Sequence, residues 1–134
     1  MKPITIGAVG TASAEVTVDN LACTVKSGVL PVFATPMMAA LMEEAACAAV
    51  EPYLEEGETT VGTKLDIHHT AATPEGLVAT ASAEIVGVCG REISFHITVS
   101  DTVGEIGTGT HQRFLVDAAR FMEKAQQRKS QPQA

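Results

Sequence analysis

Residues Thr35 to Val50 read TPMMAALMEEAACAAV and predict the one clear helix of the chain, because nearly all are good helix formers. Thr35-Pro36 is a favourable start: a threonine hydroxyl can cap free amides, and proline at the first helical position loses no intrahelical hydrogen bond. Pro52 and Gly57 end the helix. Its side chains are apolar nearly all round, and such a helix is normally wrapped by other structure. The sequence therefore predicts a central, buried helix.

One β-rich segment precedes this helix and four follow it. They are Thr11 to Val18, Thr59 to Thr70, Leu77 to Val88, Glu92 to Asp101 and Glu105 to Val116. Leu21 to Ala34 has no sustained period and predicts an irregular connection. The later segments are separated by the turn signals Thr73-Pro74-Glu75-Gly76, Gly90 and Val103-Gly104, which favour antiparallel hairpins or a meander.

A curved antiparallel sheet wrapped around a central helix is the α+β arrangement called the hotdog fold. We expect residues 1–134 to form one such domain, with a last helix over Ala118 to Arg128 and a frayed polar tail over residues 129–134. Such a sheet exposes edge strands, and pairing across a two-fold axis protects them. A homodimer or a dimer of dimers is expected.

Composition excludes several classes of protein. A net charge of -7 and a pI near 5.0 would repel nucleic acid. Three widely spaced cysteines fit neither a disulfide framework nor a zinc site, so we expect reduced thiols, no metal and a cytoplasmic location. No stretch approaches the roughly 20 apolar residues needed to span a bilayer, and Met1 to Gly10 does not resemble a signal peptide.

His69 is a candidate catalytic base. In Val61 to Thr70, the residues Val61, Leu65, Ile67 and His69 share one parity, which points His69 inward and His68 outward. An inward histidine at a strand end is often only a hydrogen-bonded core group. The parity leaves both readings open.

Glu43 and Glu44 lie on the helix expected to be buried, where a carboxylate needs a partner. At about 100° per residue, Glu43 lies roughly 80° around the axis from Thr35, whereas Glu44 lies roughly 180° away. Glu43 is therefore the better companion if Thr35 faces a site, although both glutamates could reach solvent. Thr35 has a sufficient structural role as N-cap, and a helix N-terminus can also attract an oxyanion.

The last strand carries a second set of candidates. Gly107, Gly109, His111 and Arg113 share one parity, and the glycines indicate close approach of a backbone or ligand, or a sheet bend. Arg113 could bind a carboxylate, a phosphate or Glu43, or form an ordinary ion pair.

Six short stretches, taken together, resemble the hotdog thioesterases of the fluoroacetyl-CoA thioesterase type. They are Phe33-Ala34-Thr35, Leu41-Met42-Glu43, Pro52-Tyr53-Leu54-Glu55, Val61-Gly62-Thr63, His69-Thr70-Ala71-Ala72 and Glu105-Ile106-Gly107-Thr108-Gly109-Thr110-His111. The resemblance implies a catalytic set of Thr35, Glu43 and His69, with Gly62 and Arg113 as substrate contacts. It departs at Lys26-Ser27-Gly28-Val29, where the fluoroacetyl enzyme has phenylalanines that form an apolar lid.

The expected activity is hydrolysis of a short acyl-CoA, with coenzyme A as part of the substrate and no other cofactor. His69 would act as general base, and Glu43 would either attack to give an anhydride or orient water. The alternatives are a non-catalytic acyl-thioester-binding module and an enoyl-thioester hydratase or dehydratase. Arg120, Lys124 and Arg128, spaced four apart, could bind the CoA phosphates or form a solvated helix face.

Overall fold

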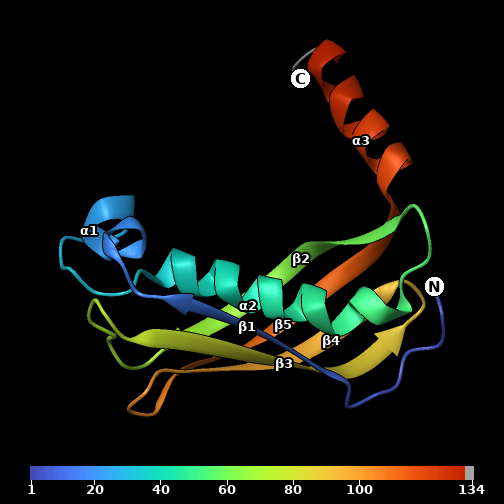
Figure 1. The fold of residues 1–134 in the computed structure, drawn as a ribbon. Coiled ribbons are helices and arrows are strands. Elements are labelled where there is room, and N and C mark those ends of the chain that lie inside the picture. The colour runs from blue at the N-terminus through green and yellow to red at the C-terminus, as the bar shows by residue number, and fades with distance from the viewer. Residues whose placement is uncertain (132–134) are drawn as a thin grey trace.

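The computed structural model describes residues 1–131 and is built on a five-stranded antiparallel sheet that curves around one long helix, α2 (Figure 1). The strands are β1 (Val9–Glu15), β2 (Glu58–His69), β3 (Val78–Cys89), β4 (Glu92–Ser100) and β5 (Glu105–Asp117). The helices are α1 (Ala22–Val25), α2 (Thr35–Val50) and α3 (Ala118–Gln127), with 3-10 turns at Val18–Asn20, Glu51–Tyr53 and Arg128–Ser130. Of the expected tail, residues 132–134 lie outside the described residues.

The strand order is β1-β3-β4-β5-β2, so β3, β4 and β5 form the predicted meander while β2 lies at an edge beside β5. The turn signal Thr73-Pro74-Glu75-Gly76 therefore does not form the predicted hairpin, and the chain instead crosses from one side of the sheet to the other. Its backbone pairs with other loops: Phe33 N donates to Thr73 O (2.8 Å), and Gly76 N donates to Val16 O (2.8 Å). These pairings replace the hairpin.

One side of α2 packs on the concave face of the sheet. Its buried residues are Met38, Leu41, Met42, Ala45, Ala46, Ala49 and Val50, and they meet Ile85, Ile93, Phe95, Ile97 and Val99 from the strands. Gly10 of β1 allows the closest approach, because a Cβ there would overlap the backbone of Ala49. The core thus lies between sheet and helix, as predicted.

The other side of α2 is exposed, which corrects the expectation of a helix wrapped on all sides. Pro36, Ala40, Glu44, Cys47 and Ala48 face outward. A single curved sheet covers only the side of the helix that it faces. Glu44 is thus the solvated member of the glutamate pair.

The first strand and its connection also differ from prediction. β1 begins at Val9 and ends at Glu15, earlier than predicted, because Thr17 caps the 3-10 turn Val18–Asn20. The expected irregular stretch Leu21 to Ala34 contains the short helix α1.

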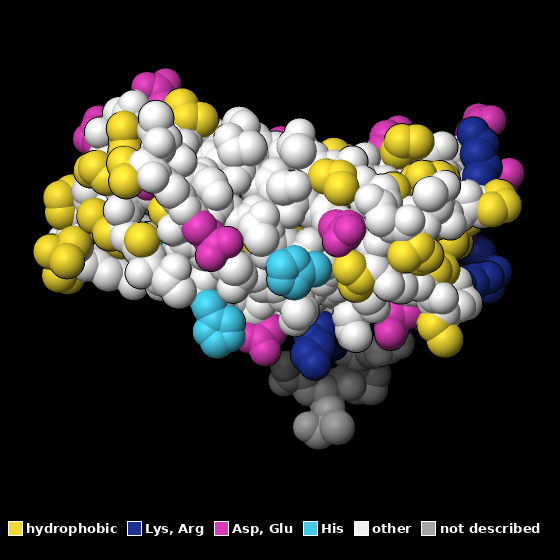
Figure 2. Space-filling view, turned by 90° about the horizontal axis from the view of Figure 1, so that it is seen from below, with side chains coloured by type: hydrophobic (Ala, Val, Ile, Leu, Met, Phe, Trp, Pro, Cys, Tyr) yellow, Lys and Arg dark blue, Asp and Glu magenta, His cyan; other side chains and the backbone are white. Residues whose placement is uncertain are grey.

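The face turned away from α2 is seen from below in Figure 2. It consists largely of backbone and small polar side chains, with isolated acidic, basic and histidine side chains and apolar ones towards both ends. Within residues 1–131, none of the helices has the length and apolar character required to cross a membrane.

Candidate active site

The first half of the site joins the start of α2 to the end of β2. The Thr35 hydroxyl lies 2.8 Å from Nδ1 of His69, and the Phe33 ring packs edge-on against the imidazole. Thr35 is the first helical residue and Ala34 occupies the N-cap, so the prediction that Thr35 caps the helix is wrong. Its hydroxyl forms a hydrogen bond with His69 instead.

His69 faces inward, as its parity predicted. Among the described residues, its Nε2 is a buried side-chain polar atom without a hydrogen-bond partner. Burial lowers the pKa of His69 below its usual value, which favours the neutral ring at pH 7. When Nδ1 donates its proton to the Thr35 oxygen, Nε2 holds a lone pair that can accept a proton.

A cavity of about 250 Å³ opens beside this pair. It is lined by Ala22, Ser27, Val32, Phe33, Thr35, His69, Thr70, Ala71 and Ala72. Its walls are small or apolar apart from the hydroxyls and the imidazole. The cavity can hold a small group beside Thr35 and the His69 ring.

The second half of the site holds Glu43. Its Oε2 accepts a hydrogen bond from Nη1 of Arg113 (2.8 Å), so the pairing that the sequence left open is with Glu43. Nε of Arg113 donates to the Thr60 hydroxyl (2.8 Å), and Nη2 donates to the Thr60 carbonyl oxygen (3.0 Å). These two bonds to Thr60 of β2 fix the guanidinium independently of its contact with the carboxylate of Glu43.

Gly62 packs directly under this ion pair. It lies opposite Arg113 in the β2–β5 register, which then shifts between Gly62 and Lys64. This bulge puts Gly62 on the same face as His69 and turns Val61 to the other face, opposite Phe114, so the parity predicted for Val61 is wrong. A single extra residue reverses strand parity.

Gly62→Ala should displace the carboxylate of Glu43 and leave the fold intact. A Cβ at residue 62 would overlap Oε2 of Glu43, which is the end of a flexible side chain and can move away. We expect a fall in turnover of about 100-fold, because a misplacement of about 1 Å can cost that much. Gly87→Ala is the control, since its Cβ would meet only Ser94 Cβ at 3.9 Å. Equal turnover in the two variants would contradict the role of Gly62; thermal unfolding checks that both fold.

The two halves are well separated within one chain. His69 lies opposite Gly107 and Gly62 lies opposite Arg113, so they are six residue steps apart along β5, which is about 20 Å of strand. Along α2, Thr35 and Glu43 are about 12 Å apart. The structure therefore brings together Thr35 with His69 and Glu43 with Gly62 and Arg113, but it does not bring Glu43 to His69 or to Thr35.

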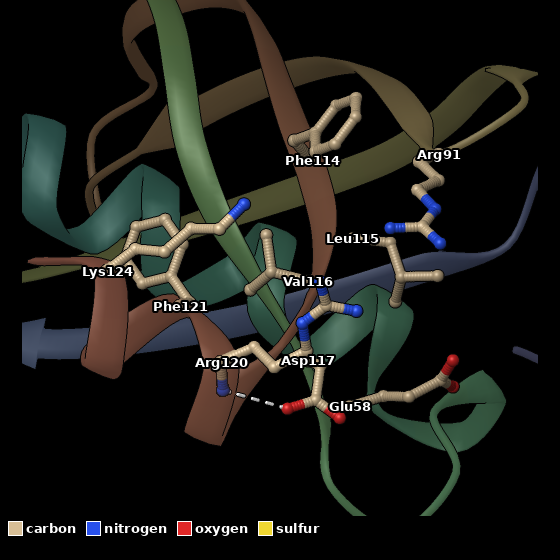
Figure 3. A pocket seen from close by; sticks show the side chains of 9 residues that line it. All are labelled: Glu58, Arg91, Phe114, Leu115, Val116, Asp117, Arg120, Phe121 and Lys124. Atoms are coloured by element: carbon tan, nitrogen blue, oxygen red, sulfur yellow. Dashed lines mark hydrogen bonds between the residues drawn. The ribbon is translucent and has the colours of Figure 1, made fainter.

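A larger cavity of about 500 Å³ lies between α3 and the ends of β2 and β5. Figure 3 shows Phe121 and Lys124 on the α3 side and Arg91 on the opposite side. Arg120 also lines it, together with Glu58, Phe114, Leu115, Val116 and Asp117. Of the three cations that are spaced four apart in the sequence, Arg120 and Lys124 thus border this cavity, while Arg128 does not.

Comparison with known proteins identifies the family. A family profile described as fluoroacetyl-CoA-specific thioesterase matches residues 16–119. The fluoroacetyl-CoA thioesterase of Streptantibioticus cattleyicolor is 46% identical over 97 residues, which cover 72% of this chain and 70% of the relative. The chain belongs to the fluoroacetyl-CoA-specific thioesterase family.

Solved structures agree with this family and with the predicted fold. A mutant of the fluoroacetyl-CoA thioesterase in complex with acetyl-CoA is 36% identical, with a TM-score of 0.88 over 93% of this chain and 98% of the other. A hot-dog-like protein from Thermanaerovibrio acidaminovorans is 19% identical, with a TM-score of 0.84 over 93% of each chain. The hotdog fold predicted from the sequence is confirmed.

Two residues that contact Arg113 in the site were given no role from the sequence. Thr60 anchors Arg113 through its hydroxyl and its carbonyl oxygen, and His111 meets Arg113 Nη1 through Nε2 (3.1 Å). The parity of β5 placed His111 beside Arg113. No sequence pattern distinguished Thr60 from the other threonines of its strand.

Proposed function

We propose that this chain hydrolyses the thioester bond of a short acyl-CoA, releasing the free acid and coenzyme A. The observation that supports this most strongly is the hydrogen-bonded pair of Thr35 and His69 at a small cavity, with Nε2 of His69 unpartnered among the described residues. The family relationship supports thioester chemistry independently.

In the proposed reaction, His69 removes a proton from water through Nε2, and the resulting hydroxide oxygen attacks the acyl carbon. The carbon–sulfur bond then breaks, and the thiolate of coenzyme A leaves with little need for acid assistance. Glu43 orients this water, or attacks first to give an anhydride that the water hydrolyses. Thr35 holds the imidazole in the orientation that this transfer requires.

The proposed set of Thr35, Glu43 and His69 requires two copies of the chain. β2 is an edge strand of the described sheet, and edge strands pair readily across a two-fold axis. Antiparallel pairing of two β2 strands can place His69 of one copy beside Gly62 of the other. Glu43 and Arg113 of the second copy would then face the cavity next to His69. We therefore propose a homodimer, or a dimer of dimers, with two composite sites in each dimer.

The acyl group proposed is short and not restricted to fluoroacetate. Ser27 lines the cavity at the segment where the fluoroacetyl enzyme has aromatic residues, and Val29 is 88% exposed. A lid without aromatic side chains offers less apolar surface to a fluorinated group. A panel of acetyl-, fluoroacetyl-, propionyl- and butyryl-CoA would measure this range.

Thiol release from that panel is the experiment that tests the proposed function. We expect release that depends on enzyme concentration with at least one short acyl-CoA. Binding without thiol release would instead identify a ligand-binding module. Addition of water to an enoyl-CoA without thiol release would identify a hydratase.

We propose that the nucleotide part of the substrate binds at the cavity between α3 and β5. Glu58 is already paired with the N-terminal ammonium (2.9 Å), and Asp117 accepts a hydrogen bond from Arg120 N (3.0 Å). The carboxylates are thus engaged, while Arg91 and Lys124 have no ion-pair partner among the described residues. Those cations can bind phosphates, and the phenylalanines can pack on adenine.

Reversing Arg120 and Lys124 to glutamate together should raise KM for acyl-CoA about 10-fold or more, as expected when a charge-assisted hydrogen bond is lost. KM for the matching acyl-N-acetylcysteamine thioester, which has no phosphate, should stay unchanged. Arg128→Glu with Lys129→Glu is the matched control outside the cavity. An equal rise for both substrates would contradict this location of the nucleotide.

We also propose that catalysis needs no cofactor beyond the coenzyme A of the substrate, and that the chain works in the cytoplasm. Its three cysteines are free and exposed, which suits a reducing compartment.

A further inference from the structure

His111 is a buried titratable group that the proposed reaction does not use. It lies in β5 with its side chain only 1% exposed, and its ring packs on that of Phe95 with centroids 5.7 Å apart. A buried polar ring in this core needs partners for both nitrogens.

The contacts of the two ring nitrogens fix the tautomer. Nδ1 lies 2.7 Å from the Lys64 carbonyl oxygen, which can only accept, so Nδ1 carries the proton. Nε2 lies 3.1 Å from Nη1 of Arg113, which can only donate, so Nε2 presents a lone pair. His111 is therefore a neutral acceptor, and its 3.7 Å approach to Glu43 is not an ion pair.

The charged groups that face this ring are Arg113 on its own strand and Glu43 on α2; β2 contributes a backbone carbonyl and β4 a phenyl ring. Burial first, and then the nearby guanidinium, lower the pKa of His111, against the opposing influence of the carbonyl and of Glu43. A proton on Nε2 would point at the N–H of Arg113 and break the contact.

Nη1 of Arg113 has two hydrogens, and the geometry gives each of them a partner. One goes to Oε2 of Glu43 and the other to Nε2 of His111. Thr60 holds the same rigid guanidinium through Nε and Nη2, but without His111 one hydrogen of Nη1 would have no partner, and its other partner, the Glu43 carboxylate, is on a side chain that is 41% exposed. His111 therefore acts together with Thr60 in fixing the position of Nη1, and Nη1 in turn holds Oε2 of Glu43.

We propose that His111 is a positioning residue, which accepts a hydrogen bond from Arg113 and so holds the guanidinium against Glu43 in the orientation that thioester hydrolysis requires. The proposal rests on the function proposed above. It assigns His111 no contact with substrate.

Three variants separate this role from simple packing. His111→Gln keeps an acceptor near the position of Nε2, His111→Asn keeps only a donor near Nδ1, and His111→Phe keeps only the ring. We expect Asn and Phe to lower kcat by about 10- to 100-fold with KM nearly unchanged, and Gln to recover most of kcat. His96→Asn, on the exposed side of β4, is the control.

The pH profile gives a readout that packing alone would not change. If His69 and His111 must both be neutral, two protons inactivate the wild type, and its kcat should fall by about 100-fold per pH unit at the acid end of the profile. In His111→Gln only His69 titrates, so kcat should fall by about 10-fold per pH unit. Equal kcat losses in the Gln and Asn variants, with the same acid limb as the wild type, would overturn the proposal.

Nitrogen NMR of the side chains tests the positioning without any activity. The wild type should show a protonated Nδ1 and an unprotonated Nε2 at His111, and a slowly rotating Arg113 guanidinium that becomes mobile in His111→Asn but not in His111→Gln. A protonated Nε2, or a guanidinium equally ordered in all variants, would overturn the proposal. If no acyl-CoA is hydrolysed, the proposed function fails while the NMR result still decides the role of His111.

Discussion

His69→Ala should reduce the hydrolysis of acyl-CoA by about 100- to 10,000-fold, the range that a general base contributes. The reason is that His69 lines the cavity with its buried Nε2 unpartnered among the described residues, while the Thr35 hydroxyl holds Nδ1. Because burial lowers the pKa of His69, wild-type activity should persist below pH 6.5 and then fall as the ring gains its proton. Steady-state thiol release across pH measures both effects.

The neighbouring residues supply the controls for this experiment. His68→Ala and Glu44→Gln should retain wild-type activity, because both side chains face solvent. Glu43→Gln should lose activity as His69→Ala does. Equal losses from His68→Ala and His69→Ala would show that the assigned histidine is wrong.

Mixing two inactive variants should restore activity. In a dimer of one His69→Ala chain and one Glu43→Gln chain, one composite site carries both changes and the other carries neither. Mixed dimers purified through two different affinity tags should therefore show about half of the wild-type rate, since one of two sites is intact. Thiol release from the purified mixed dimer, against each variant alone, is the measurement.

A site formed within one chain predicts the opposite result. Each chain of the mixed dimer would then lack one catalytic group, and the rate would remain that of the single variants. A double variant, His69→Ala with Glu43→Gln, paired with an unmodified chain is a further control. It should leave no intact composite site, whereas sites within one chain would leave one.

Much of the fold was predictable because its signals are local. The helix Thr35–Val50 follows from propensity and from Pro36, and four of the strands begin and end within one or two residues of their predicted bounds. The inward orientation of His69 followed from period two. The pairing of Thr35 with His69 also joins two residues that the resemblance had implied.

What could not be predicted depends on contacts between distant segments. The crossover after β2 depends on loops pairing with the 73–76 turn, and the bulge after Gly62 is one extra residue that no local pattern marks. Thr35 resembled an N-cap because a hydroxyl there normally finds backbone amides; here an imidazole from a strand end takes it. The separation of Glu43 from His69 appears only when strand register is known.

The distance between those two side chains has a consequence for the living cell. Since each newly made polypeptide would carry only half of every reaction centre, it could not consume acyl-CoA before meeting another like it. Dilution would shift the equilibrium towards inactive monomers, and specific activity would rise with protein concentration until all chains are in dimers.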